Sequence, residues 1–155
     1  MALIIVLAVA LQGCSTYGPS DEFIGLQRQS IAERMGPPTD ERQGLRETIL
    51  EYARGPAGRH TYFLTFGPDG RLSKWEQVLK VENFEKIKPD MTTERVKSLI
   101  GTSFAVSQLG RNRGEVWSYR YENDICVWFQ VEFSADGRVR SAGNGIPPEC
   151  LTPNE

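Results

Sequence analysis

The sequence predicts an α+β fold made of two tandem units, each with two short helices followed by a three-stranded antiparallel meander. Two observations lead to this prediction. One pattern of residues recurs in the two halves of the chain, and several short segments alternate apolar with polar residues, which is typical of strands with one buried face.

The repeat is clearest at a tight turn. Residues 66–72 read Phe-Gly-Pro-Asp-Gly-Arg-Leu, and about 67 residues later residues 133–139 read Phe-Ser-Ala-Asp-Gly-Arg-Val. Asp-Gly favours a hairpin turn, because Asp bonds its own backbone there and Gly accepts a positive φ. Each copy therefore predicts the end of one strand, a turn and the start of the next strand.

A short helix precedes the strands in each half. Residues 31–36 match residues 96–101, and each segment ends in a glycine, which commonly follows the last turn of a helix. In the second copy Thr92 is expected to cap the helix, with Met91 packing on Val96. Gln27 stands at the cap position of the first copy, which predicts a weaker helix start there.

Three strands are expected after each helix. In the second half, residues 125–133 alternate apolar with mostly polar side chains and follow a strand near residues 116–121, while a third strand begins at Val139. In the first half the equivalents lie near residues 49–52 and 62–66, with a third strand from Leu72. Such units are close to the lower size limit for independent stability, so we expect the two to pack together.

The first thirteen residues contain no charged side chain and are almost entirely apolar, as in the core of a secretory signal peptide. The end of this stretch and the next residue, Leu11-Gln12-Gly13-Cys14, resemble the bacterial lipobox, in which the cysteine is lipidated and becomes the new N-terminus. Ser15 after the cysteine resembles an outer-membrane sorting signal. We therefore expect a protein anchored by lipid at Cys14 to the outer membrane, facing the periplasm.

The domain organisation expected from these features has five segments. They are a signal peptide at 1–13, a tether at 14–21, a first unit at 22–81, a second unit at 82–150 and a tail at 151–155. Of the two cysteines left after lipidation, Cys126 and Cys150 are expected to form a disulfide, because the periplasm oxidises thiols; two free thiols are the alternative.

The composition argues against several classes of function. Lys and Arg number 18 against 20 Asp and Glu, so the formal net charge of -2 gives no general attraction to nucleic acid. The single histidine, His60, leaves little scope for imidazole-based catalysis or metal binding, and its position predicts a solvated or hydrogen-bonded side chain. We expect no enzyme activity, no metal and no cofactor.

Residues of the second unit resemble the BamE family, also called the SmpA/OmlA lipoprotein domain. The shared positions are Phe84, Ile87, Asp90-Met91-Thr92, Val96, Leu99, Gly101 and Trp117-Ser118-Tyr119. The resemblance spans residues 84–143, and more weakly 23–79. It implies a non-catalytic role in the outer-membrane barrel-assembly machinery or in envelope integrity, through contacts with partner proteins and anionic lipid head groups. Asp90 and Ser103 depart from the family's Gly and Pro.

Two copies of the helix-and-meander unit in one chain are also similar in architecture to the tandem β-lactamase inhibitor proteins. This similarity implies an alternative, an inhibitor-type module that binds a periplasmic or cell-wall enzyme through a sheet face. A third alternative is a hydrolase whose site the sequence does not reveal.

Five side chains are candidates for contact with a partner. If Phe129 faces the helices, Trp128 points to the opposite face of the sheet, and the same alternation places Phe63 on that face of the first unit. An aromatic residue on a helix-free face either packs inside the molecule or anchors a partner. Trp75 is open to both interpretations. Arg111 and Arg113 lie in a basic loop that would suit anionic lipid.

Overall fold

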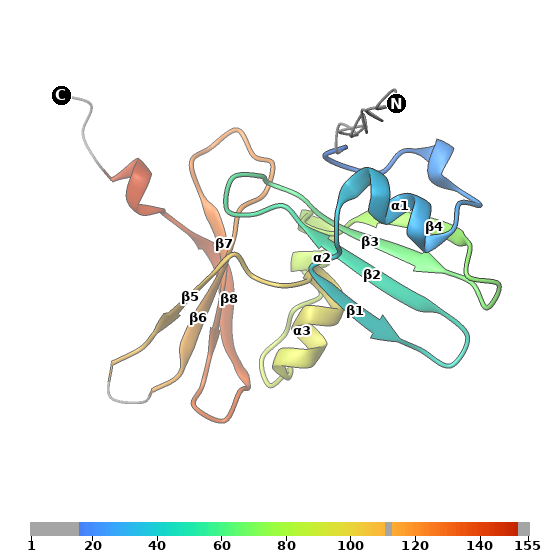
Figure 1. Cartoon of the computed structure of the whole chain (residues 1–155). Coiled ribbons are helices and arrows are strands. Elements are labelled where there is room, and N and C mark those ends of the chain that lie inside the picture. The colour runs from blue at the N-terminus through green and yellow to red at the C-terminus, as the bar shows by residue number, and fades with distance from the viewer. Residues whose placement is uncertain (1–15, 111–112, 152–155) are drawn as a thin grey trace, which may run out of the picture.

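The computed structural model describes residues 16–110 and 113–151. Its first half has a short 3-10 helix and one α-helix followed by four strands, paired antiparallel in the order β1-β2-β3-β4 (Figure 1). The elements are η1 (Asp21–Phe23), α1 (Arg28–Met35), β1 (Asp40–Gln43), β2 (Thr48–Ala53), β3 (Thr61–Phe66) and β4 (Leu72–Gln77).

The second half repeats this order with a second antiparallel sheet, β5-β6-β7-β8, and adds a 3-10 turn at its end. The elements are α2 (Val81–Phe84), α3 (Thr93–Ile100), β5 (Ala105–Gln108), β6 (Glu115–Tyr119), β7 (Trp128–Phe133), β8 (Val139–Gly145) and η2 (Pro148–Cys150). The fold is thus α+β, with two four-stranded antiparallel sheets. No helix within the described residues is long and apolar enough to cross a membrane.

Each half has four strands, one more than the three-stranded meander expected from the sequence. The additional strands, β1 and β5, have only four residues each and lie at sheet edges. β1 reads Asp-Glu-Arg-Gln, so it has no apolar side chain to mark a buried face. Its backbone groups still pair with β2, and its charges are typical of an edge strand that avoids pairing with other chains.

The two halves also share details of backbone bonding. Leu72 donates its amide N–H to the carbonyl of Leu26 at 2.9 Å, and Val139 donates to Met91 at 2.9 Å. The preceding residues, Gly25 and Asp90, have φ of 85° and 67° and return a bond to the same strand. The start of the third strand in each predicted meander is thereby tied to the segment that precedes the helix.

The helix caps differ as the sequence predicts. The Thr92 side chain accepts a hydrogen bond from the amide N–H of Arg95 at 3.2 Å, at the first turn of α3. Gln27, at the same position before α1, makes no such bond. Gly36 and Gly101 end the two helices with φ of 81° and 78°, a conformation that glycine adopts without strain.

Each helix covers one face of its own sheet. Ile31 and Met35 of α1 pack on the first sheet, and Val96 and Ile100 of α3 pack on the second. The sheet residues of the first core include Leu50, Tyr52, Leu64, Phe66 and Leu72, and those of the second include Trp117, Tyr119, Phe129, Val131 and Phe133.

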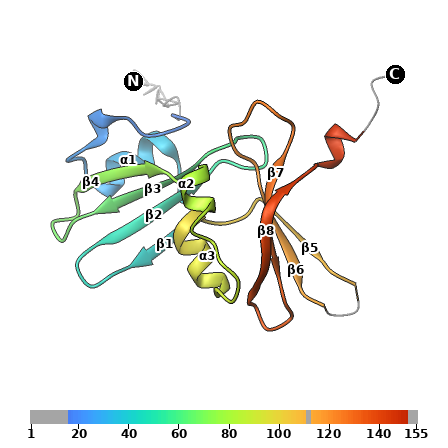
Figure 2. The same cartoon turned by 180° about the vertical axis from the view of Figure 1, so that it is seen from behind.

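The end of α3 also packs against the first sheet, so that this helix lies between the two sheets in both views (Figures 1 and 2). Glu51 of β2, only 1% exposed, accepts a hydrogen bond from the amide N–H of Thr102 at 2.6 Å. Arg42 of β1 donates to the carbonyl of Lys97 at 3.0 Å. Gly101 stands between these two contacts, and a Cβ there would lie 2.7 Å from Thr61.

Burial changes the acid–base properties of this junction. Loss of solvent raises the pKa of Glu51, against the opposing effects of the Thr102 hydrogen bond and the Arg42 charge. Burial, together with the nearby Glu51, also holds the pKa of Tyr119 well above its usual value. The hydroxyl of Tyr119 donates to the carbonyl of Gly101 at 3.1 Å.

Candidate binding site beside the disulfide

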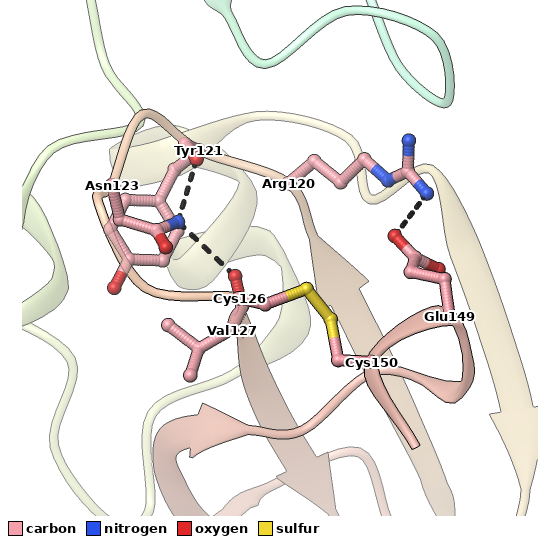
Figure 3. The surroundings of a disulfide bond; sticks show 7 residues. All are labelled: Arg120, Tyr121, Asn123, Cys126, Val127, Glu149 and Cys150. Carbon is pink, nitrogen blue, oxygen red and sulfur yellow. Dashed lines mark hydrogen bonds and ion pairs between the residues drawn. A yellow bond between two sulfur atoms is a disulfide. The ribbon is translucent and has the colours of Figure 1, made fainter. Parts of the chain in front are cut away.

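A disulfide joins Cys126 to Cys150, which confirms the predicted pairing (Figure 3). The two Cα atoms are 6.1 Å apart and the cysteines are 24 positions apart in the sequence. The bond fastens the segment after β8 to the loop that leads into β7. A closed loop of this length is worth roughly 3 kcal/mol of stability through restriction of the unfolded chain.

The loop before β7 is shaped by Asn123. Its side-chain amide donates to the carbonyls of Tyr121 and Val127, at 2.8 and 3.2 Å (Figure 3). Consequently β7 begins at Trp128, later than the expected start at Ile125, whose side chain is exposed. The disulfide and the Asn123 bonds thus keep residues 125–127 in a loop, although the alternation of the sequence predicts a strand there.

Arg120, directly after β6, links this loop region to two other parts of the chain. It forms an ion pair with Glu149, which lies next to Cys150 (Figure 3). It also donates to the carbonyl of Pro56, in the loop between β2 and β3, at 3.1 Å. One guanidinium therefore connects the two halves of the chain and the C-terminal turn.

Two aromatic rings flank the same guanidinium. The Arg120 carbon Cζ lies 5.4 Å from the ring centroid of Trp128 and 5.8 Å from that of Phe104. The two rings meet edge to face, with centroids 4.8 Å apart. Such cation–π contacts are each worth about 0.5–2 kcal/mol, depending on solvent exposure. We call Arg120, Trp128 and Phe104 the arginine–aromatic cluster.

A polar cavity of about 240 Å³ adjoins the cluster. Two buried atoms of its lining residues, Arg120 Nε and Asn123 Oδ1, have no hydrogen-bond partner among the described residues. One is a donor and the other an acceptor. Other lining residues include Arg59, Asp124, Trp128 and Glu149.

Trp128 lies where the alternation predicts. Phe129 points into the core below α3, while Trp128 lies on the opposite face of the sheet and is half-buried. Trp128 and Cys126 line the same cavity as Glu149 of the C-terminal turn. The exposed part of the indole is available to a partner.

Phe63 and Trp75 occupy different surroundings. Phe63 lies on the face opposite α1, as the alternation predicts, but the end of α3 packs on that face. Only 9% of Phe63 is exposed, and the Arg42 guanidinium covers its ring at 4.2 Å. Phe63 therefore belongs to the junction between the two halves. Contrary to the expectation from the sequence, it is too buried to contact a partner. Trp75 is half-buried against the first core, and its indole N–H donates to Asp21 at 3.1 Å.

The remaining expected sites are at the surface or outside the described residues. Cys14 and Arg111 lie outside them. Arg113 is exposed, and its Nε donates to the carbonyl of Gly110 at 3.0 Å. Thr16 and Tyr17 of the predicted tether are hydrogen-bonded to the first half, Thr16 to the carbonyl of Arg34 at 2.6 Å.

His60 is hydrogen-bonded, as predicted for a histidine at a strand start. Its Nδ1 is 2.8 Å from the hydroxyl of Tyr17, its ring stacks on Tyr62, and Nε2 is 3.6 Å from a carboxylate oxygen of Glu122. Within residues 16–110 and 113–151, no group of three or more His, Cys, Asp or Glu side chains is arranged to hold a metal ion.

The sequence analysis identified Trp128 and the cysteines but missed Arg120, Phe104 and Asn123. Arg120 and Asn123 lie in the loop between β6 and β7, whereas Phe104 precedes β5, and no short motif connects the three. Only the pairing of Cys126 with Cys150 hinted that the tail lies close to Trp128. The arginine at the centre of the site has no local sequence signal.

No protein-family model matches the chain, and no curated protein matches it. Among solved structures, the chain is similar to a DUF4309 family protein, YjgB, from Bacillus subtilis, at 14% identity over 78% of each chain, with a TM-score of 0.31. It is also similar to an extracellular protein containing an SCP domain from Bacillus anthracis, at 12% identity and a TM-score of 0.34. That match covers 95% of this chain and 51% of the other. TM-scores this low do not support an inference about fold or function.

Proposed function

We propose that the protein is a lipid-anchored module of the outer membrane that faces the periplasm and binds a protein partner without catalysing a reaction. The partner surface that we assign is the arginine–aromatic cluster. Trp and Arg dominate the energetics of protein interfaces, because each combines a large contact area with hydrogen-bond donors. Here the two lie together, half-exposed, on a sheet face that has no helix of its own.

The disulfide supports an extracytoplasmic location, since such bonds persist mainly in oxidising compartments. Lipidation at Cys14 would hold the module beside the membrane. In this proposal the two halves are tandem BamE-like units, and the partner belongs to the outer-membrane barrel-assembly machinery or to envelope maintenance.

The rival proposal is an inhibitor-type module that binds a periplasmic or cell-wall enzyme. One contact favours it: Trp128 lies on the helix-free face of the second sheet, where an inhibitor of this kind would meet its enzyme. Both proposals use the same cluster. They differ in the identity of the partner and in the need for the membrane anchor.

The test is crosslinking of the full-length lipidated protein in outer membranes, followed by affinity purification and mass spectrometry. Wild type is compared with Arg120→Ala and Trp128→Ala, and near-UV circular dichroism checks that each variant is folded. Arg46→Ala is the matched control, because Arg46 is an exposed arginine in the loop between β1 and β2 and belongs neither to the cluster nor to the proposed lipid contact. Loss of the partner only with Arg120→Ala and Trp128→Ala supports the site.

Each outcome separates the proposals. Recovery of barrel-assembly components, lost in a Cys14→Ala variant, supports the membrane role. Recovery of a soluble periplasmic enzyme, independent of Cys14, supports the inhibitor instead. Equal recovery of the partner by Arg120→Ala and Arg46→Ala would overturn the assignment of the cluster.

Arg113 keeps its separate role as a proposed contact to anionic lipid head groups. Co-sedimentation of the protein with phosphatidylglycerol vesicles is expected to fall in Arg113→Ala and to be unchanged in Arg120→Ala. The effect of removing one surface charge is about 1 kcal/mol, or roughly fivefold in affinity. Equal binding by both variants would remove Arg113 from the proposal.

A further inference from the structure

The two sheets end in equivalent outer strands, β4 and β8 (Figure 2). Trp75 of β4 pairs with Leu64, and Ala142 of β8 pairs with Val131. Leu64 and Val131 are fully buried residues of the two cores. Trp75 and Ala142 therefore occupy the same place in the two halves, on the face that the helices cover.

In the first half this place is filled by the indole of Trp75. Its ring meets Tyr62 edge to face, with centroids 6.2 Å apart, and its N–H donates to Asp21 of η1. The tryptophan thus closes the space between the outer strand and the short helix. The first half shows that an aromatic side chain fits this position.

In the second half the methyl group of Ala142 is too short to close the equivalent space beside the outer strand, so this space remains open. A hollow of about 650 Å³ lies between α2 and β8. Its lining includes the apolar side chains of Val81, Phe84, Ile87 and Phe129. Val81 is 54% exposed, an unusual degree for a valine beside a core.

The edge next to the hollow is poorly protected. β8 has seven residues, of which the first, Val139, bonds the backbone of Asp90 and Met91 on the outer side. Within the described chain, residues 140–145 pair with β7 only. β4 has the charges of Lys74 and Glu76, which discourage pairing at an edge. In β8 the only charge is Arg140, followed by the uncharged stretch 141–145.

We propose that β8 is a docking edge for an extended peptide segment of a partner protein, which adds a strand to the second sheet and places an aromatic side chain in the hollow. Main-chain hydrogen bonds to the free edge of β8 would supply most of the affinity. The hollow supplies selectivity, because its apolar side chains can contact an aromatic ring while Glu85, Lys88 and Asn144 make the rest of its lining polar. This surface is separate from the arginine–aromatic cluster and does not depend on the proposed function.

The probe is a fluorescein-labelled heptapeptide of alternating serine, threonine and valine with one central tryptophan. Binding to the folded protein is measured by fluorescence anisotropy, and amide chemical shifts in ¹⁵N spectra locate it. We expect shifts at β8 and around the hollow. Replacing the peptide tryptophan by alanine, or N-methylating alternate peptide amides, is expected to weaken binding at least tenfold.

The protein variant Ala142→Trp fills the hollow from within, as Trp75 does in the first half. It is expected to weaken peptide binding at least tenfold and to remain folded, because Ala142 is exposed. Ser141→Trp, the neighbouring residue on the opposite face of β8, is the matched control and is expected to bind within twofold of wild type.

Three results would overturn the proposal. They are peptide binding that is insensitive to Ala142→Trp, chemical shifts confined to another edge, or no binding of the peptide at millimolar concentration. A dimer abolished by Ala142→Trp in sedimentation, without peptide binding, would show that the occupant of β8 is a second copy of the chain. Loss of the arginine–aromatic cluster in Arg120→Ala is expected to leave peptide binding unchanged, which keeps the two surfaces distinguishable.

Discussion

The carboxylate of Glu51, in the first sheet, accepts a hydrogen bond from the backbone N–H of Thr102, just beyond the end of α3, at 2.6 Å. This bond joins the two halves through a side chain that is almost completely buried. The second carboxylate oxygen, Oε2, has no hydrogen bond among the described residues and lies 3.8 Å from Arg42. The junction therefore contains a charge that is partly but not fully satisfied.

The stability of the protein should respond to the ionisation of Glu51. Because burial raises its pKa above the ordinary value of 4.5, the folded state binds this proton more tightly than the unfolded state. This contribution to the free energy of unfolding therefore decreases as the pH rises from 4.5 through the raised pKa. Glu51→Gln removes the titration and keeps an acceptor for Thr102. Chemical denaturation between pH 4 and 8 should show the variant gaining on wild type as the pH rises.

Glu76 provides a control of opposite sign. The ammonium of Lys80, 2.8 Å away, lowers the pKa of this carboxyl below its ordinary value of 4.5. The contribution of Glu76 to the free energy of unfolding is therefore present above pH 4.5 and is lost as the pH falls through the lowered pKa. Glu76→Gln should therefore lose stability relative to wild type as the pH rises. The pair is half-exposed, so the effect should be under about 1 kcal/mol. Parallel pH profiles for wild type and Glu51→Gln would contradict the assignment at the junction.

Gly101 and Gly36 end equivalent helices and test the tightness of the junction. Both have φ near 80°, so alanine at either position should cost about 1–3 kcal/mol from backbone strain. A Cβ at Gly36 meets nothing within 4 Å, whereas one at Gly101 would lie 2.9 Å from the Glu51 carboxylate. Gly101→Ala should be the more destabilising by at least about 1 kcal/mol in urea denaturation. Equal losses would mean that the junction relaxes freely.

The helix caps give a second matched pair. Thr92→Ala removes the bond to the Arg95 amide and should lower the free energy of unfolding by about 1 kcal/mol. Gln27→Ala, at the same position before α1, removes no capping bond and should have an effect within about 0.5 kcal/mol of zero. Thermal denaturation of the two variants gives the comparison, and a similar loss in both would disprove the assigned cap.

The disulfide should stabilise the protein and organise the binding site. A Cys126→Ser/Cys150→Ser double variant should lose roughly 3 kcal/mol in denaturant and become insensitive to added dithiothreitol. Wild type treated with dithiothreitol should match the double variant. Trp128 fluorescence should also change, because Glu149 would no longer be held beside Arg120. A wild type unaffected by reduction would show that the bond contributes nothing to stability.

Strand alternation was a reliable guide where a strand has one apolar face. It placed Trp128 and Phe63 on the faces opposite Phe129 and Leu64, as the register shows. The face that carries Phe63 is nevertheless covered by the end of α3. It failed for β1, whose Asp-Glu-Arg-Gln sequence carries no apolar signal and is held by backbone pairing with β2 and by polar side-chain contacts such as that of Arg42 with the carbonyl of Lys97. It also extended β7 too far, because the alternation continues through a loop that Asn123 and the disulfide bend away.

The amino-acid sequence by itself determined the α+β fold class, the recurrence of one pattern in the two halves, the cap at Thr92 and the pairing of the cysteines. These features follow from local periodicity, turn chemistry and a simple count of thiols. Three features were decided by the tertiary structure alone. The backbone just beyond α3 bonds to Glu51, and Arg120 lies beside the rings of Trp128 and Phe104. The space beside Ala142 stays open. Each of these depends on packing between separate segments of the chain, and the shape and charge of such contacts have no signature in either segment alone.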